Sequence, residues 1–327
     1  MKRLRRDLAL LLLIALPAAV LDRLGAFQAL AARLEPQIPW TAPLEPGESA
    51  AWSPPALREP EAPAETPLPA EVPAAAPAGS PAPAAEAALP SLRVGGSLAP
   101  DLRSLLREGW SYALDGDGPQ ILILHTHACE AFTPAGADTY TSSGDFRTLE
   151  EEQSVIALGD VVAAALEERG FRVLHDREKY DWPAYNGAYD RSGEAVRALL
   201  EQYPEIRVVI DLHRDSLGGR KTRYVTPDGE DSAQVMLLLT TGENGLYHPN
   251  WRENLKLGLE LQQQMDRDYP GLARDLDLSP ARYNQHLCPG SFLLEVGTEA
   301  NTLAEAKKAA ALFADCLCSV LETHWEG

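Results

Sequence analysis

Short apolar runs alternate with amphipathic stretches throughout the C-terminal part of the chain, and this alternation limits the folds that it can adopt. Five of these runs have the length and apolar character of buried strands. They are Ile121–Leu124, Arg172–His175, Arg207–Leu212, Gln234–Thr240 and Phe292–Val296. Strands that alternate with helices are typical of a mostly parallel sheet covered by helices. The sequence therefore predicts an α/β fold with three layers, in which helices cover both faces of a mostly parallel or mixed sheet.

Helical stretches fill the gaps between these runs. The first is expected from Glu150 to Arg169 and ends at Gly170, a residue that often follows a helix because it adopts a left-handed conformation at little cost. Three others follow Ser192, Asn250 and Thr302, whose side chains can accept hydrogen bonds from the free N–H groups of the first turn. Each helix lies between two expected strands or follows the last of them, as the alternating pattern requires.

Proline, alanine and glutamate dominate the segment from about Glu35 to Pro90, which contains almost no aromatic residues. Such a segment cannot bury enough apolar surface to fold, and it is expected to be a semi-extended spacer. We therefore divide this part of the chain into a linker at residues 31–96 and one folded catalytic domain at residues 97–327.

The N-terminus reads MKRLRRD and continues into the apolar run Leu8–Leu21, an order typical of export signals. The run is about fourteen residues long, whereas a spanning helix needs roughly twenty, so a cleaved signal peptide and a retained anchor both remain open. Residues 1–30 are expected to be a signal or anchor segment at the cell membrane. The bulk of the chain is then expected outside the cytoplasm.

Charge and cysteine content exclude two classes of protein. The formal net charge is −19, and nucleic-acid binding needs clustered Lys and Arg that the folded part lacks, so no nucleic-acid partner is expected. The four cysteines have no spacing typical of a disulfide framework or a zinc knuckle. Cys129 and Cys288 both flank the groups considered next, and whether they pair is left open.

Polar side chains with the chemistry of metal ligands follow three of the expected strands. His127 and Glu130 come after the first, His213 after the third, and Glu295 lies at the end of the last. In open α/β sheets, ligands bind beyond the carboxyl ends of the strands, where such groups meet. Two histidines and a carboxylate around an open position form a common hydrolytic zinc site. A further glutamate nearby can take a proton from zinc-bound water, so a zinc hydrolase is expected.

Four segments resemble the stage II sporulation protein P family. They read ILILHTHACEAF, VLHDREKYDWPAYNGAYDRS, VVIDLHRDS and YNQHLCPGSFLLEVGTEANT, and the resemblance runs from about Gly118 to the C-terminal helix. That family is related to zinc-dependent N-acetylmuramoyl-L-alanine amidases, whose motif E-x-G-x-x-x-N is echoed by Glu295, Gly297 and Asn301. The resemblance implies an amidase-like or zinc-carboxypeptidase-like fold. It also implies cleavage of peptidoglycan between the glycan and the stem peptide, with endopeptidase activity as a further possibility, at the engulfing septum of a spore former.

The resemblance also implies roles for the residues at the strand ends. His127, Glu130 and His213 are expected to bind Zn²⁺, and Glu295 is expected to act as the general base. In the wider amidase family the carboxylate ligand comes from the start of the first helix, where this chain has Glu151. Glu151 therefore remains an alternative to Glu130, and its other interpretation is a capping residue of that helix.

Three residues near these groups are candidates for contact with the substrate. Arg214 follows His213 directly and is expected either to stabilise an oxyanion or bind a substrate carboxylate, or to form an exposed ion pair with Asp215. Asn284 and Gln285 lie in the loop that enters the last strand and are expected to line the cleft.

The remaining histidines and the aromatic residues have less specific interpretations. His125 shares a strand face with His127 and is either a partner of a ligand or an alternative ligand. His248 and His324 are expected at the surface. Tyr185 and Tyr189 can form a wall for a sugar or peptide, although aromatic residues in such a segment more often pack on the core.

Partners follow from the resemblance and from the N-terminal segment. They are peptidoglycan, the membrane, and, by resemblance, a sporulation lytic transglycosylase and a membrane scaffold protein. The rival interpretation is a non-catalytic module that binds the cell wall with the same fold. A barrel with an H-x-H metal motif is disfavoured because it needs eight strand–helix units.

Overall fold

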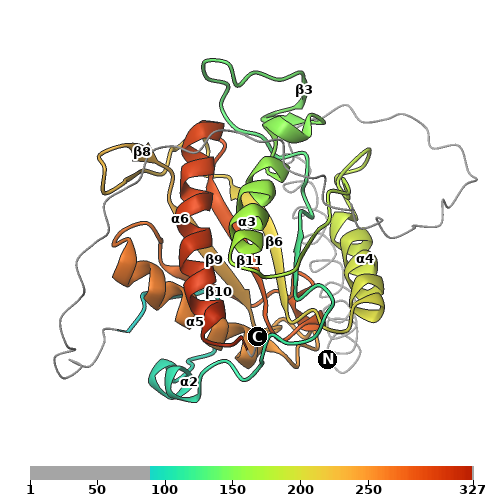
Figure 1. Ribbon diagram of the computed structural model, residues 1–327. Coiled ribbons are helices and arrows are strands. Elements are labelled where there is room, and N and C mark those ends of the chain that lie inside the picture. Colours follow the sequence, from blue (N-terminus) through green and yellow to red (C-terminus); the bar gives the residue numbers. More distant parts are fainter. Residues whose placement is uncertain (1–88, 326–327) are drawn as a thin grey trace, which may run out of the picture. The chain divides into compact units, whose positions relative to one another are not determined.

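The computed structural model describes residues 89–325, which contain a seven-stranded sheet (Figure 1). In spatial order its strands are β1 (Leu92–Val94), β10 (Leu276–Ser279), β9 (Val235–Thr240), β11 (Ser291–Thr298), β6 (Val208–Asp215), β2 (Ile121–Leu124) and β5 (Val173–His175). All neighbours are parallel except β9 and β11, which are antiparallel. The expected α/β fold with a mostly parallel, mixed sheet is confirmed.

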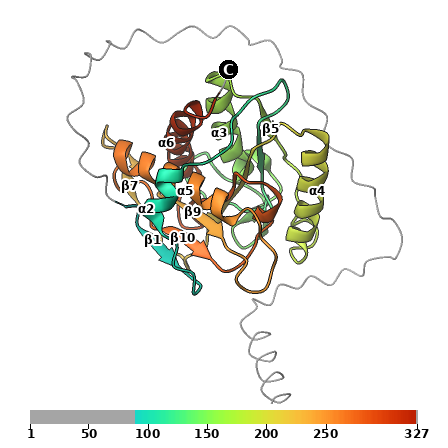
Figure 2. The same cartoon turned by 90° about the horizontal axis from the view of Figure 1, so that it is seen from below.

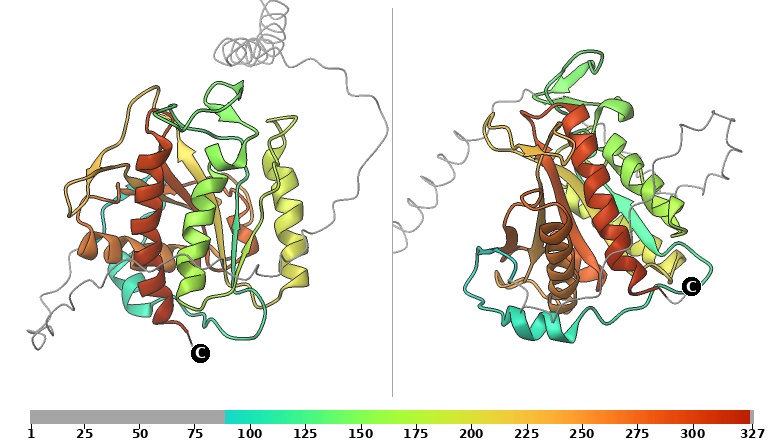
Figure 3. Two further views of the ribbon diagram at one scale, coloured as in Figure 1. Left: turned by 45° about the horizontal axis from the view of Figure 1, so that its top comes forward. Right: turned by 60° about the vertical axis from the view of Figure 1, so that its left-hand side comes forward.

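Helices cover both faces of this sheet (Figures 2 and 3). They are α2 (Leu102–Glu108), α3 (Ile156–Glu168), α4 (Ala188–Gln202), α5 (Trp251–Asp268) and α6 (Leu303–Glu322). Successive strand side chains point to opposite faces. Ile121 and Ile123 accordingly join the larger core cluster, with residues of α3, α5 and α6. Leu122 and Leu124 join the smaller cluster, with residues of α4. The three expected layers are therefore present.

Two strands of the sheet were not expected from the sequence. β10 has alternating leucine and polar residues, and β1 forms the edge of the sheet, where Leu92 pairs with Leu276. The linker expected at residues 31–96 thus overlaps the first strand, and the folded part begins a few residues earlier than predicted. The rest of that linker lies outside the described residues.

Two helix starts differ from the prediction. The stretch expected to be helical from Glu150 instead contains a short 3₁₀ helix, Glu151–Gln153, and α3 begins only at Ile156. The helix expected after Ser192 already begins at Ala188. Ser192 is buried within α4, where its hydroxyl lies 2.8 Å from the Thr126 hydroxyl, so a tertiary contact uses the oxygen that a cap would need.

The last helix starts as the sequence predicts. The Thr302 hydroxyl accepts from the Glu305 N–H, and the Glu305 carboxylate accepts from the Thr302 N–H, which completes a capping box. Capping of this kind satisfies two backbone donors that would otherwise lack partners. It fixes the start of α6 directly after β11.

Three short elements complete the described fold. β3 (Ser142–Gly144) pairs with β4 (Arg147–Thr148), and β7 (Tyr224–Val225) pairs with β8 (Asp231–Ser232), both antiparallel. A 3₁₀ turn, η2 (Gln285–Leu287), precedes β11. Within residues 89–325 no helix has the length and hydropathy needed to cross a bilayer. The signal or anchor segment expected at residues 1–30 lies outside the described residues.

Gly159 allows α3 to pass close to two buried imidazoles. A Cβ atom there would lie 2.4 Å from His175 Nε2 and 2.7 Å from His125 Nε2, both closer than atoms can approach. Alanine normally stabilises a helix relative to glycine. We expect the reverse here, with Gly159→Ala lowering the free energy of unfolding by about 1–3 kcal/mol through overpacking. Urea denaturation measures this directly.

The matched control combines Gly159→Ala with His175→Ala, which removes one of the two rings. The loss caused by alanine at 159 should be smaller in the His175→Ala background than in the wild type, because the closest contact is gone. Equal losses in both backgrounds would show that the His175 ring does not limit this position.

Candidate active site

The catalytic candidates gather where β2, β6 and β11 end. Glu295 on β11 pairs in register with His213 on β6, so their side chains lie on the same face of the sheet. The chain after β2 bends over the end of β6, because Asp211 accepts hydrogen bonds from the Thr126 N–H at 2.8 Å and the Thr126 hydroxyl at 2.7 Å. This bend brings His127 and the residues after it above His213.

The structure brings His127, Glu130 and His213 together. Glu130 Oε2 lies 3.4 Å from His213 Nδ1, and the rings of His127 and His213 have centroids 5.5 Å apart. Burial alone would raise the pKa of Glu130, but its contact with His213 and the charge of Arg214 lower it. Burial alone would lower the pKa of His213, but the carboxylates of Asp211 and Glu130 raise it well above its usual value. Glu130 and His213 therefore favour charged forms of opposite sign.

Glu295 is a carboxylic acid without a hydrogen-bond partner. Its Oε2 is inaccessible to solvent and unpaired among the described residues. Burial raises the pKa of Glu295 to about 8, and the nearby His213 offsets only part of that shift. A carboxyl group with a pKa near neutral can both accept and donate a proton.

The donor types of this cluster suit zinc, which prefers imidazole nitrogens and carboxylate oxygens. His127 Nδ1 and His213 Nε2 are buried and make no hydrogen bond, and each faces a buried aspartate, Asp181 at 3.8 Å and Asp211 at 2.8 Å. Among residues 89–325, however, no three His, Cys, Asp or Glu side chains are arranged to hold an ion together. These residues therefore have the ligand atoms that zinc prefers, and their side chains would have to move closer together to bind one ion.

Glu151 lies in a separate ion-pair cluster. Its carboxylate accepts from Lys179 at 2.7 Å and from Arg177 Nε at 2.9 Å. The capping box considered for Glu151 is absent, because Thr148 lies in β4 and α3 starts later in the chain. Of the two carboxylates considered as the metal ligand, the structure places Glu130 beside His213.

Arg214 is buried and its guanidinium contacts backbone carbonyls. Nε donates to Ala131 O at 3.2 Å and an amino group donates to Phe146 O at 3.3 Å. Its own N–H donates to Glu130 Oε2 at 3.2 Å. The ion pair expected with Asp215 is made instead by Arg274, at 2.8 Å. Arg214 thus holds the loop that carries Glu130, and a direct role in catalysis stays a prediction.

The amides of Asn284 and Gln285 form hydrogen bonds within the fold. Gln285 is buried and contacts Thr240 Oγ1 at 3.0 Å and Leu238 O at 2.9 Å. Asn284 donates to Tyr189 O at 2.8 Å. These contacts fasten the loop before β11 to β9 and α4, and substrate binding by either residue stays a prediction.

His125 faces away from His127 into the core. Its Nδ1 lies 2.8 Å from Leu212 O, and its Nε2 lies 2.9 Å from His175 Nε2. Both ring nitrogens are thus occupied, and burial, together with the neighbouring His175, lowers the pKa of His125 to about 3. In this structure His125 is a packing partner beneath the site.

The surface position expected for His248 is wrong. His248 is buried, and its Nε2 lies 3.0 Å from Thr240 Oγ1. Its neighbours Leu246 and Tyr247 are exposed, so the burial of His248 comes from tertiary contacts and not from a buried apolar run in its own segment. His324 is partly exposed and pairs with Glu260 at 2.8 Å.

The burial of His248 predicts a loss of stability in acid. Burial lowers its pKa to about 4 from a usual value of 6.5. Between about pH 6.5 and pH 4, His248 is therefore protonated in the unfolded chain but neutral in the folded chain. The free energy of unfolding falls as the pH drops through this range. Thermal melting across this range should show a shallower decline for His248→Gln than for the wild type. Identical slopes would mean that His248 contributes nothing to the pH dependence.

Arg147, Asp181 and two tyrosines surround His127. Tyr185 stacks on the His127 ring at 4.3 Å with an interplanar angle of 3°, and it is 56% exposed. Tyr189 meets the same ring edge-on at 5.5 Å. Asp181 is fully buried and pairs with Arg147. The tyrosines are candidates from the sequence alone, but Arg147 and Asp181 have no local signal because their contacts join distant segments.

All four cysteines are free and buried, so the pairing left open for Cys129 and Cys288 does not occur in the structure. Burial raises the pKa of each thiol, to about 12 for Cys129 and Cys288. Thiols of this kind are unreactive at neutral pH and pack as small apolar groups.

Comparison with known proteins decides the family. The family of stage II sporulation protein P matches residues 70–318. The chain belongs to this family. A curated relative, stage II sporulation protein P of Bacillus subtilis (strain 168), is 29% identical over 222 residues, which cover 64% of this chain and 52% of the relative. This stage II sporulation protein P family member thus spans about half the length of the curated relative that it matches.

Solved structures with weak similarity to this family member include two amidases. The N-acetylmuramyl-L-alanine amidase Ami1 from Mycobacterium smegmatis is 13% identical, with 64% of this chain and 100% of that chain covered and a TM-score of 0.40. The CwlD amidase from Clostridioides difficile, solved with the GerS lipoprotein, is 12% identical, with 62% and 99% covered and a TM-score of 0.39.

The E-x-G-x-x-x-N motif of this family member is largely structural beyond Glu295. Gly297 has a φ of +67°, and a Cβ there would meet Ala233 at 3.0 Å. Asn301 is fully buried, and its side chain joins its own turn to the segment at Thr222: Oδ1 accepts from the Thr298 N–H at 3.1 Å, and Nδ2 donates to Thr222 O at 2.9 Å. The motif thus turns the chain sharply after the strand that carries Glu295.

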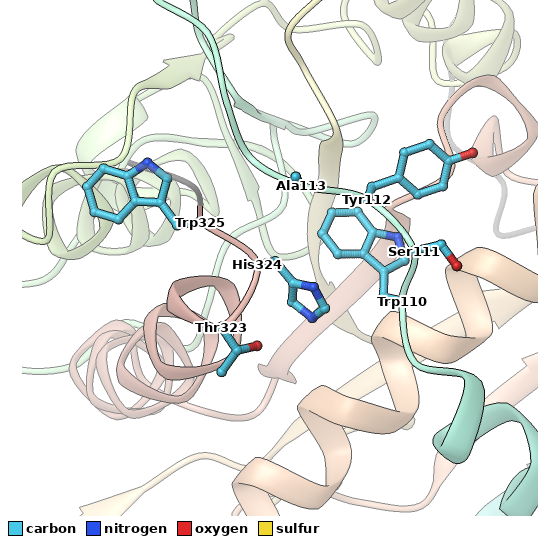
Figure 4. Close-up of a pocket in the computed structure, with 7 residues that line it drawn as sticks. All are labelled: Trp110, Ser111, Tyr112, Ala113, Thr323, His324 and Trp325. Atoms are coloured by element: carbon cyan, nitrogen blue, oxygen red, sulfur yellow. The ribbon is translucent and has the colours of Figure 1, made fainter.

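A shallow pocket of about 260 Å³ lies away from this site, where the C-terminal end of α6 meets the segment after α2 (Figure 4). It is lined by Trp110, Ser111, Tyr112, Ala113, Thr323, His324 and Trp325. A β-bridge joins Leu114 to Trp325 beside this pocket. Trp110 Nε1 donates to Pro289 O at 2.9 Å, just before the start of β11, whereas the catalytic candidates lie where the strands end. None of the candidate site residues contributes to this pocket.

Proposed function

We propose that this family member is a zinc-dependent peptidoglycan hydrolase that cleaves the amide between N-acetylmuramic acid and L-alanine, in the remodelling of the septal wall during sporulation and engulfment. The observation that carries the proposal is the meeting of His127, Glu130 and His213 beside the unpaired carboxyl group of Glu295. Family membership supports a role in sporulation. Some endopeptidase activity on stem peptides is included in the proposal.

In this proposal His127, Glu130 and His213 hold the zinc ion. When bound, zinc supplies a Lewis acid that polarises the scissile carbonyl and lowers the pKa of a water molecule. Glu130 is fixed for this role by the backbone N–H of Arg214. The guanidinium of Arg214 in turn holds the loop after β2 through the Ala131 carbonyl.

Glu295 transfers the proton. In its ionised form it accepts a proton from the attacking water, whose oxygen bonds to the carbonyl carbon. The protonated carboxyl group then donates to the amide nitrogen as the C–N bond breaks, which leaves a free carboxylic acid and a free amine. In the metal-free chain, burial raises the pKa of Glu295 to about 8, and a carboxyl group with a pKa raised toward neutral is suited to taking up and releasing a proton. Its position in register with His213 keeps it at the side of the zinc ligands.

The site of action and the partners are part of the same proposal. The N-terminal segment would attach the protein to the cell membrane, with the catalytic domain outside the cytoplasm. A sporulation lytic transglycosylase would cut the glycan strands that this amidase frees of stem peptides, and a membrane scaffold protein would hold the two together. The substrate is the cell wall and not a nucleic acid, in keeping with the net charge of −19.

Removal of metal should abolish the activity. We expect the full-length chain to release stem peptides that begin with L-alanine from purified peptidoglycan, to lose this activity with a chelator, and to regain it when zinc is added back. Mass spectrometry of the released fragments identifies the bond cleaved. Wall that stays intact while the protein sediments with it would instead favour the non-catalytic binding module.

A further inference from the structure

Asp181 is a buried carboxylate beside His127 and is not explained by the fold alone. It lies between β5 and α4, and its side chain has no exposed surface. Burying a charge is costly unless it is paired. Here the partners are the Arg147 guanidinium, from β4, and the Cys129 N–H at 3.3 Å, so three separate segments of the chain meet at one carboxylate.

The carboxylate oxygen that pairs with Arg147 is also the one nearest the histidine. Asp181 Oδ2 lies 3.8 Å from His127 Nδ1, and that nitrogen is buried without a hydrogen-bond partner. A shift of about 1 Å would bring the two atoms to hydrogen-bond distance. Tyr185, stacked at 4.3 Å, and Tyr189, edge-on at 5.5 Å, keep the imidazole in its plane, so that Nδ1 stays directed at Asp181.

The second histidine of the site has the same kind of neighbour. His213 Nε2 lies 2.8 Å from Asp211 Oδ1, a close ion-pair contact that lacks hydrogen-bond geometry. Asp211 is itself held by the Thr126 N–H. With Nε2 facing Asp211, it is Nδ1 of His213 that faces Glu130. Each histidine thus has one nitrogen toward a buried aspartate and one left for another contact.

We infer that Asp181 is a positioning residue that accepts the Nδ1–H of His127 and thereby leaves Nε2 as the nitrogen that binds the metal. Carboxylates that fix the tautomer and orientation of a ligand histidine commonly change metal affinity by 10–100-fold when removed. The inference rests on the proposed function for the role of the metal. The pairing of Asp181 with His127 is a property of the metal-free chain and can be measured without any activity.

The first measurement is the tautomer of His127 in the metal-free, full-length wild type. With ¹⁵N-labelled histidine, two-bond nitrogen–proton correlation spectra distinguish the Nδ1–H from the Nε2–H form, and a His127→Gln variant identifies the signals. The inference expects Nδ1–H. A predominant Nε2–H form would overturn it, whatever the variants show.

The second measurement is cobalt affinity, followed by absorption spectroscopy with Asp181→Ala and Asp176→Ala. Asp176 is a matched control because it is buried in the same segment and contacts Tyr180 but not His127. We expect Asp181→Ala to bind cobalt 10–100-fold more weakly than the wild type, with Asp176→Ala within about twofold of it. Unchanged affinity in a folded Asp181→Ala variant would overturn the inference, and if this variant fails to fold, the wild-type tautomer decides.

Failure of the proposed function would look different. A wild type that neither binds cobalt nor releases stem peptides would refute the zinc hydrolase, and with it the role of Asp181 in metal binding. The tautomer spectrum would still decide whether Asp181 orients His127.

Discussion

Replacing Glu295 by glutamine should lower the rate of peptidoglycan hydrolysis by about 10²–10⁴-fold, the usual contribution of a general acid–base group. The side chain keeps its size, but an amide cannot take a proton from water and pass it to the leaving amine. Stability should not fall, because the wild-type carboxyl group is buried with one oxygen unpaired. Release of stem peptides, measured against time by mass spectrometry, gives the rate.

The control for this substitution is Glu201→Gln, at an exposed position on α4. It makes the same chemical change away from the site and should leave the rate within about twofold of the wild type. If Glu295→Gln retained more than a tenth of wild-type activity, the proton would have to be transferred by another group, and the role assigned to Glu295 would be abandoned.

Asn301→Ala should destabilise the fold by about 3 kcal/mol or more, because each buried backbone group that loses its partner costs about 1–3 kcal/mol. The amide satisfies the Thr298 N–H at 3.1 Å, the Thr222 N–H at 3.3 Å and the Thr222 carbonyl at 2.9 Å. These groups lie in the interior, so water cannot replace the amide. Urea denaturation of the full-length chain measures the change.

Asn250→Ala is the matched control, since within residues 89–325 the Asn250 side chain donates a single hydrogen bond, to His286 O at 2.8 Å. It should cost about 1 kcal/mol, in line with the loss of a single hydrogen bond. Similar losses in both variants would indicate that Asn301 is not the centre of a network, and that the motif residue has some role other than holding the turn.

The parts of the fold that the sequence predicted are those in which local pattern and tertiary environment agree. β2 is buried on both faces and appears as an uninterrupted apolar run, and β11 contains the buried apolar run Phe292–Leu294 directly before Glu295. β10 has a leucine at every second position and a polar residue between, and β1 has only three residues at an exposed edge. Neither strand contains an apolar run long enough to be distinguished from a loop in the sequence.

The candidate site divides in the same way. His127, Glu130, His213 and Glu295 could be found because each stands at the end of an apolar run, and the topology of parallel strands brings such ends together. Asp181 could not be found, since its contacts with Arg147 and Cys129 join segments that are distant in the sequence. For Ser192 the local pattern was misleading. It resembles the start of a helix, but Ser192 lies inside α4 and its hydroxyl contacts the Thr126 hydroxyl.

In the seven-stranded sheet of residues 89–325, β9 and β11 are the one antiparallel pair of neighbours, and this has a consequence for how this family can change its substrate. It reverses the direction of β9, β10 and β1, so the loops that enter β9 and β10 reach the same edge as the strand ends that carry the catalytic candidates. Arg274, just before β10, already reaches Asp215 across this junction. Loops that enter strands can lengthen without displacing the catalytic side chains. Substrate preference could therefore evolve on one half of the sheet while the chemistry is kept on the other.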